Sequence, residues 1–356
     1  MPTYKPEALQ QVGAGIFAAA GATVEDANTV AQRLVEANLA GHDSHGVIRI
    51  PQYLKSVEAG DISTGVPVEV TRETAASAVL DGKWGFGQVV ASKAIDIGVA
   101  KAQQAGVSAI TVRHSNHIGR LGSYVEDAAS QGVIALLFAN AHGAGVSTAP
   151  WGGTQPRLST NPLAVGIPAA PPLLTTPLVL DMTTSAVAEG KIRVKKNRGE
   201  PVPDGWILNL QGEPTNIADE FYGPPRGSIL PFGGAAGGHK GFGLGVIVDI
   251  LAGCLSGART THSPDARIGN ASFFLFIDVK QFTPVDEFEA TVCGLISWVK
   301  STPMLPGFDK VLMPGEIEQR EIARRRSEGL FIEDETWHQI QECGRKLGVA
   351  VEVEEE

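Results

Sequence analysis

The amino-acid sequence predicts an α/β protein of the α+β type, in which a mixed-sheet domain is inserted between helical segments from the two ends of the chain. Apolar residues recur at helical spacing near both termini, whereas the middle alternates short apolar strands with helices. No G-x-G-x-x-G motif follows a predicted strand, so the domain is expected to be non-Rossmann. We expect a helical segment over 1–72, a central mixed α/β domain over 73–283, and a helical segment over 284–356 that packs with the first.

Three helices are expected near the N-terminus, over 6–20, 24–40 and 45–59. Thr23 is a suitable N-cap for the second helix, which Gly41 ends. Asp43 or Ser44 can cap the third helix, in which Pro51 is expected to produce a kink.

The strands and helices of the central and C-terminal parts are predicted from the spacing of apolar residues and from the turn-forming residues between them. Asp81-Gly82 has the composition of a turn. Strands are expected over 66–71, 77–80, 107–112, 133–140, 163–168, 178–182, 206–210 and 273–279. Helices are expected over 87–105, 119–130, from 185 onward, and over 238–255, 288–300, 316–326 and 333–348.

Composition limits the class of protein. The 356 residues carry a net charge of −10, which argues against nucleic-acid or anionic-membrane binding, although the basic run over 191–198 could hold a phosphorylated ligand. Cys254, Cys293 and Cys343 are far apart and form neither a disulfide framework nor a zinc motif. No apolar signal region or membrane-length apolar run is present, so we expect a cytoplasmic protein.

One polar stretch dominates the N-terminal part: Gly41-His42-Asp43-Ser44-His45-Gly46, followed by Arg49 and Tyr53. On one helix, His45, Arg49 and Tyr53 would lie along a single face. Similar clusters occur at predicted element ends over 113–122, 158–162, 181–185 and 237–243. So many polar clusters at element ends predict a shared pocket.

Metal chemistry is one reading of these clusters. His42-x-x-His45 and His114-x-x-His117 have a spacing that could bind a metal, with Asp43 or Asp181 as an oxygen ligand. No third-ligand pattern such as H-E-x-x-H accompanies them, so we favour no metal. Ser44 as a hydrolase nucleophile is also disfavoured, because no G-x-S-x-G elbow exists.

Hydride transfer to a 2-oxo acid is the competing reading. Arg49 could hold the substrate carboxylate, and His45 or His117 could protonate the carbonyl oxygen. Ser44 and Asp181 are of the right residue type to orient that imidazole.

The same motifs resemble a known family. G-H-D-S-H-G (41–46), S-N-H-I-G-R (115–120), T-N-P (160–162), D-M-T-T-S-A (181–186), G-H-K-G (238–241) and P-G-E (314–316) resemble the malate/L-lactate dehydrogenase-like NAD(P)-dependent oxidoreductases, in that family's order. The segments D-G-K-W-G-F-G-Q-V-V-A (81–91) and W-V-K-S-T-P (298–303) are most similar to the hydroxycarboxylate dehydrogenase B branch.

The resemblance implies a non-Rossmann cofactor-binding domain framed by terminal helices, a homodimer, and NAD or NADP as cofactor. Between the two cofactors we lean slightly to NAD, while the basic run over 191–198 keeps NADP open. It assigns the catalytic relay to Ser44, His45 and Asp181, with His117 as a rival to His45 for the acid/base, and turns Arg49 and Tyr53 toward the substrate. The implied cofactor contacts are His45, Gly119, Arg120, Leu121, Val179, Leu180, Asp181, Met182, Thr183, His239, Asn270, Gly315, Glu316, Ile317 and Glu318.

The expected activity is therefore interconversion of a small 2-hydroxycarboxylate and its 2-oxoacid, with malate, lactate or hydroxyphenylpyruvate-type substrates. A ketimine reductase acting on cyclic imino acids is the first alternative. A metal-dependent hydrolase that uses the two H-x-x-H pairs is the second.

Overall fold

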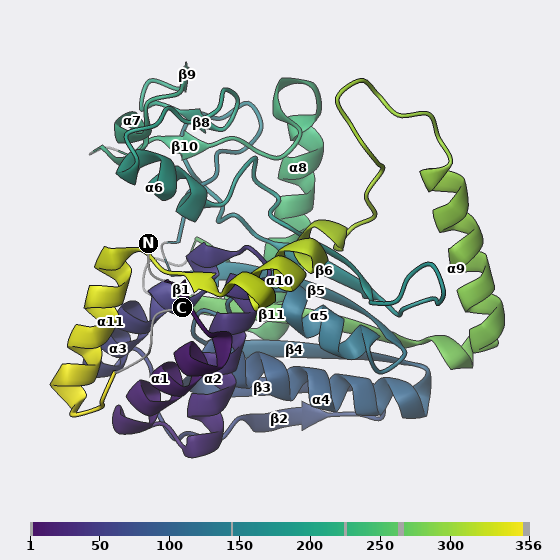
Figure 1. Cartoon of the computed structure of the whole chain (residues 1–356), viewed down its shortest axis with the longest axis horizontal. Helices are drawn as coiled ribbons and strands as arrows, with labels where there is room; N and C mark the ends of the chain where they lie inside the picture. The colour runs from purple at the N-terminus through teal and green to yellow at the C-terminus, as the bar shows by residue number, and fades with distance from the viewer. Residues whose placement is uncertain (1–2, 144, 224–225, 263–266, 352–356) are drawn as a thin grey trace.

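The computed structural model describes residues 3–143, 145–223, 226–262 and 267–351 (Figure 1). Its terminal parts contain β1 (Thr3–Tyr4), α1 (Pro6–Ala19), α2 (Val24–Leu39), the 3-10 turns η1 (Asp43–His45) and η2 (Val47–Arg49), α3 (Ile50–Glu58), α9 (Val285–Lys300), α10 (Glu316–Glu328), β12 (Leu330–Phe331) and α11 (Asp334–Leu347). The middle contains β2 (Glu69–Glu73), β3 (Ser77–Gly85), α4 (Gly87–Ala105), β4 (Val107–Ser115), α5 (Gly122–Ala129), β5 (Val133–His142), β6 (Leu163–Ile167), β7 (Leu178–Met182), α6 (Glu189–Asn197), β8 (Ile207–Leu208), β9 (Pro214–Thr215), α7 (Ala218–Tyr222), β10 (Ser228–Ile229), α8 (Gly234–Asp249), the π-helical turn η3 (Ile250–Cys254), β11 (Gly269–Asp278) and the 3-10 turn η4 (Val279–Gln281).

A seven-stranded mixed sheet, in the order β2-β3-β4-β11-β5-β6-β7, forms the centre of the molecule. Only β3 and β4 run parallel; the other neighbours are antiparallel. Helices α4 and α5 pack on the sheet over a continuous core that includes Leu80, Ile110 and Phe274. This arrangement confirms the predicted mixed α/β fold class.

The two ends of the chain share a second core. Leu34 of α2 and Tyr53 of α3 pack in one cluster with Leu330 of β12 and Ile340 of α11. Strand β1 pairs with β12, which brings the termini to the same side of the molecule (Figure 1). Helix α9 does not join this cluster. It packs through Ile296 against the loop around Ala170 and Leu174, at the opposite side of the molecule (Figure 1).

A small subdomain spans α6 to β10. The sequence did not predict it as separate from the central α/β domain. It has its own core, around Ile192 and Phe221, and a three-stranded sheet in the order β10-β8-β9. It lies above the central sheet in Figure 1. One of its helices, α6, reaches the cavity described below.

The structure corrects several local expectations. The helix expected over 45–59 is wrong in its first part, because two 3-10 turns precede α3. The kink expected at Pro51 is also wrong. Pro51 lies in the first turn of α3, where a backbone N–H has no partner within the helix, so its absence costs nothing. The turn at Asp81-Gly82 is also wrong, because β3 continues to Gly85 through a bulge. Helix α5 begins only at Gly122, and α8 begins at Gly234, so the 237–243 cluster lies inside a helix.

Candidate active site

A cavity of about 780 Å³ lies where the N-terminal segment, the central sheet, the small subdomain and α10 meet. That volume is typical of a cofactor-sized site. Most of the expected site residues line it: Ser44, His45, His117, Gly119, Arg120, Leu121, Asp181, Met182, Thr183, Asn270, Ile317 and Glu318.

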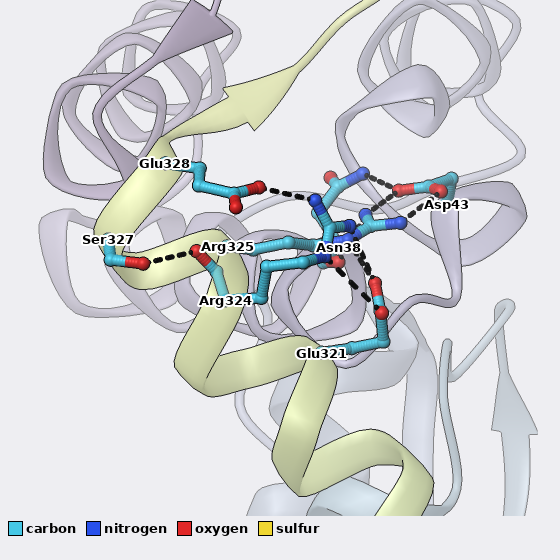
Figure 2. A network of polar contacts seen from close by, with 7 residues as sticks. All are labelled: Asn38, Asp43, Glu321, Arg324, Arg325, Ser327 and Glu328. Atoms are coloured by element: carbon cyan, nitrogen blue, oxygen red, sulfur yellow. Dashed lines mark hydrogen bonds and ion pairs between the residues drawn. The ribbon is translucent and has the colours of Figure 1, made fainter.

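The turn that carries the first polar stretch is held by two helices (Figure 2). Arg325 of α10 donates from Nη1 and Nη2 to the Asp43 carboxylate, at 2.6 and 3.1 Å, and from Nη1 to the backbone carbonyl of Asn38 at 2.7 Å. The Asn38 side chain of α2 donates to Asp43 at 2.7 Å and accepts from the Val47 N–H at 2.8 Å. A Cβ at Gly46 would lie 2.1 Å from Asn38 Oδ1, so this close approach requires glycine.

Two imidazoles face each other at the end of this turn. The rings of His45 and His117 are stacked, with centroids 5.4 Å apart and planes inclined by 21°. Ser44 Oγ lies 3.1 Å from Nδ1 of His45, and Tyr53 Oη lies 2.6 Å from Nδ1 of His117. Each imidazole is therefore anchored at Nδ1 by a hydroxyl, which leaves Nε2 as the free nitrogen.

Burial dominates the electrostatics of the pair. It lowers the pKa of His45 to about 3, with further lowering by the cations Arg49, Arg120 and Lys191 and by the neighbouring His42. The pKa of His117 lies well below its ordinary value for the same reason, with Arg49 and His45 as further causes. Both rings are therefore neutral at pH 7 until an anion joins them.

Arg49 lies beside the histidines rather than on the cavity wall. Its Nε donates to the Ser44 carbonyl at 2.6 Å and its Nη1 to Gln52 Oε1 at 2.5 Å, which fixes the guanidinium. Burial lowers the pKa of Arg49, yet the group stays a cation. After burial, its positive charge is the largest cause of the lowered pKa of both His45 and His117.

A second cation faces another part of the cavity. Arg120 is 5% exposed, and its buried Nε has no hydrogen-bond partner among the described residues. The nearest carboxylates are Asp181, 3.9 Å from Nε, and Glu126, 3.7 Å from Nη1. Asp181 also accepts from the Gly122 N–H at 2.7 Å. Asp181 thus holds the start of α5 and Arg120, and no described contact joins it to His45 as the relay would require.

Several expected residues do not line the cavity: Arg49, Tyr53, Val179, Leu180, His239, Gly315 and Glu316. Tyr53 is 3% exposed and lies behind His117, so its expected direct contact with the substrate is not what the geometry provides. His239 is exposed on α8 and packs against Trp151.

The two H-x-x-H pairs separate in space. His42 lies 3.7 Å from Glu318, whereas His45 stacks on His117. His114 points to Asp81, with Nδ1 2.9 Å from Oδ2. Among the residues that the structure describes, no three His, Cys, Asp or Glu side chains are grouped to hold a metal ion.

Sequence reasoning missed three residues around the cavity. Asn38 orders the polar turn, Gln88 contacts Tyr53, and Lys191 lines the cavity beside Ser44 and His45. Asn38 and Gln88 lie in helices, where a polar side chain is usually exposed to solvent. Only the burial of these two side chains in the folded protein indicates that they contribute to the site. Lys191 was visible as the start of the basic run.

Residues 4–341 match the family model described as malate/L-lactate dehydrogenase. The chain belongs to this family. It is 37% identical over 336 residues to a malate dehydrogenase of Pyrococcus abyssi, which covers 92% of this chain and 90% of that protein. It is 35% identical to hydroxycarboxylate dehydrogenase B of Escherichia coli K12, covering 98% and 95%.

The solved structures agree with the family. The crystal structure of malate dehydrogenase from Entamoeba histolytica superposes with a TM-score of 0.92 at 29% identity, over 98% of each chain. The family resemblance, the enzyme class and the fold predicted from sequence are thereby confirmed: this member of the malate/L-lactate dehydrogenase family is an oxidoreductase. No helix in the described ranges is long and apolar enough to cross a membrane.

The family implies a nicotinamide cofactor, and the cavity fits one. Its volume suits a dinucleotide, and the buried Arg120, with a spare donor, suits an anionic group such as a pyrophosphate. The residues that would hold the cofactor are Gly119, Arg120, Leu121, Asp181, Met182, Thr183, Asn270, Ile317 and Glu318.

Proposed function

We propose that this protein interconverts a 2-hydroxycarboxylate and its 2-oxoacid, with NAD or NADP as the hydride acceptor or donor. The observation that carries the proposal is the stacked pair His45 and His117 on the cavity wall, with Arg49 fixed beside it. A fixed cation next to a neutral imidazole is what a carboxylate-bearing carbonyl substrate needs.

Each residue then has a role. Arg49 lies outside the cavity lining and supplies a fixed positive charge beside the histidines, which attracts the carboxylate next to the reacting carbon. His117 exchanges a proton with the substrate oxygen through Nε2, because Tyr53 occupies Nδ1. When bound, the nicotinamide ring supplies or accepts the hydride at the reacting carbon. His45, held by Ser44, packs against His117 and is its rival for the proton transfer.

The lowered pKa of His117 is compatible with an acid role. The incoming carboxylate places a negative charge near the imidazole, and an opposite charge raises the pKa of a histidine. Substrate binding would therefore charge His117 when a proton is needed, and leave it neutral when the site is empty.

We favour NAD over NADP. The basic run over 191–198, which was the main support for NADP, is largely neutralised: Arg193 pairs with Glu189, Lys195 with Glu200, and Lys196 with Asp219. We also propose a cytoplasmic location, on the sequence grounds given above.

We further propose a homodimer. Helix α9 and the loop after it project from the sheet and expose large apolar side chains, namely Leu295, Trp298, Leu305 and Phe308. Trp298 is 78% exposed, and such a group of side chains suits a second copy of the chain. Light scattering coupled to gel filtration would measure one dimer mass; a monomer at micromolar concentration would contradict this.

A screen tests the activity. Purified protein is assayed with NADH and NADPH against pyruvate, oxaloacetate, sulfopyruvate, phenylpyruvate and piperideine-2-carboxylate. The proposal expects turnover with a 2-oxoacid. Turnover with the imino acid alone would favour the ketimine reductase, and failure of NADH and NADPH to bind in a fluorescence titration would refute both.

A further inference from the structure

The segment Trp84-Gly85-Phe86-Gly87-Gln88 ends next to His117, and no function has yet been given to the contact of its Gln88 with Tyr53. Gln88 lies in the first turn of α4 and is 1% exposed. Its Nε2 donates to the Tyr53 hydroxyl at 2.8 Å, and that hydroxyl lies 2.6 Å from Nδ1 of His117. A buried chain of three polar side chains therefore leads from α4 to the cavity.

The backbone brings α4 to this place by close contact. A Cβ at Gly87 would lie 2.3 Å from the carbonyl oxygen of Asn116 and 2.4 Å from that of His117, so only glycine lets the helix start against the His117 backbone. Asn116 Nδ2 donates to the carbonyls of Trp84 and Gly85, at 2.8 and 3.2 Å, which fixes the bulged end of β3.

We propose that Gln88 and Tyr53 are positioning residues that set the ring orientation and the proton placement of His117. The proposal deepens the proposed function, since it rests on His117 exchanging a proton with the substrate. Gln88 donates to the Tyr53 oxygen, so the Tyr53 proton is directed to Nδ1 of His117. In the empty site the neutral imidazole then carries its proton on Nε2, the nitrogen left free for the cavity.

The chemistry of this pair suits a proton carrier. A hydroxyl both donates and accepts, and a primary amide offers one group of each kind. The charged imidazolium, and the neutral ring left after Nε2 has given its proton to the substrate, both carry a proton on Nδ1. The Tyr53 oxygen then accepts a hydrogen bond from Nδ1–H, and the Tyr53 hydroxyl can donate its own hydrogen bond to Gln88 Oε1 once the amide turns over. That oxygen is buried and has no partner in the described part of the chain. A carboxylate at position 88 could only accept.

The groups that face His117 all bear on its titration: His45 from η1, Arg49 from η2 and Tyr53 from α3. None of them is a carboxylate. Gln88→Glu would introduce one that accepts from Tyr53 and attracts an imidazolium two groups away, while changing the size of the side chain very little.

The test compares Gln88→Glu, Gln88→Met and Tyr53→Phe with the wild type by the pH profile of kcat/KM. Gln88→Glu should move the profile upward by about one pH unit. Gln88→Met and Tyr53→Phe should lower kcat about tenfold or more, a part of what acid–base catalysis contributes. Cofactor affinity should stay unchanged. Gln103→Glu, at the exposed end of α4, is the matched control and should leave the profile unchanged.

A second measurement needs no activity. Nitrogen-15 spectra of the histidine rings should show one neutral tautomer of His117, protonated on Nε2, and a mixture of tautomers in Tyr53→Phe. A mixture in the wild type, or wild-type kcat and pH profile in folded Gln88→Glu and Gln88→Met, would overturn the proposal. An enzyme inactive on every substrate would instead refute the proposed function, and the spectra would still decide this inference.

Discussion

The imidazoles of His45 and His117 lie stacked, 5.4 Å between centroids, and burial depresses the pKa of both. A charged ring next to another charged ring would be strongly disfavoured there. The pair can therefore take up one proton readily only when a negative charge arrives. Substrate binding and protonation of the pair are coupled by this arrangement.

Proton uptake on binding is the first prediction. Binding of an unreactive 2-oxoacid analogue such as oxamate, in the presence of cofactor, should draw up to about one proton from the buffer at neutral pH, because the carboxylate raises the pKa of the adjacent histidine. Calorimetric titration in buffers of different ionisation enthalpy measures this. Binding heats that do not depend on the buffer would contradict it, and His117→Asn should abolish the dependence.

The stability of the protein should fall as the pH falls through the mildly acid range. In the unfolded chain each histidine binds a proton below about pH 6.5, whereas folded His45 stays neutral down to about pH 3. Between these values the unfolded state holds more protons, so the free energy of unfolding decreases with falling pH, by about 1.4 kcal/mol per unit and histidine at most.

Urea unfolding at several pH values checks this expectation. His117→Asn should flatten the dependence below about pH 6.5, since one of the two histidines with a lowered pKa is gone. His338→Asn, on the exposed side of α11, should keep the wild-type slope. Equal slopes in all three proteins would show that the buried histidines do not control acid stability.

The neighbours Arg324 and Arg325 offer a matched pair on α10 (Figure 2). Arg325→Ala removes the bonds to Asp43 and Asn38 that hold the His42–His45 turn, and should cost about 1–3 kcal/mol of unfolding free energy and weaken cofactor binding. Arg324→Ala removes only exposed pairs within the helix, to Glu321 and Glu328, and should change the unfolding free energy much less than Arg325→Ala. Equal losses from the two variants would contradict a role for Arg325 in the site.

Lys191 should favour substrates with a second negative group. Lys191 lines the cavity and forms no ion pair within the ranges described, so its ammonium is available to a carboxylate or sulfonate beyond the reacting carbon. Lys191→Met should raise KM for oxaloacetate or sulfopyruvate about tenfold and change KM for pyruvate much less. Lys195→Met, which breaks only the pair with Glu200, is the control. A uniform rise in KM for all substrates would argue against this selectivity.

Local sequence signals predicted most of the secondary structure, but not that of the segment before α3, which carries Ser44 and His45. Helix α4 and strand β7 have the predicted bounds, and Thr23 caps α2 by accepting from the Asp26 N–H. The helix predicted before α3 is wrong because a proline in a helical pattern can mark either a kink or the first turn of a helix. Periodicity does not separate these cases, whereas the tertiary bonds of Asn38 and Asp43 do.

The sequence likewise predicted only part of the candidate site. The residue types of Ser44, His45 and His117 pointed to the cavity, and the structure brings them together. Tyr53 was expected on the substrate side from the family resemblance and from a helix face shared with His45 and Arg49. In the structure two 3-10 turns interrupt that helix, and the Tyr53 hydroxyl contacts Nδ1 of His117. Gln88 is distant in sequence from both partners, so no local pattern could connect them.

The position of β11 between β4 and β5 has a consequence for how the protein comes into being. Strands β4 and β5 leave the ribosome early, but each lacks one of its two neighbouring strands until residues 269–278, which form β11, have been synthesised. Until then the nascent chain holds two half-sheets with open edges, a state prone to mispairing. Asn270, which accepts from the Ile118 N–H beside His117, arrives with that strand, so the loop that carries His117 is secured only after about three quarters of translation.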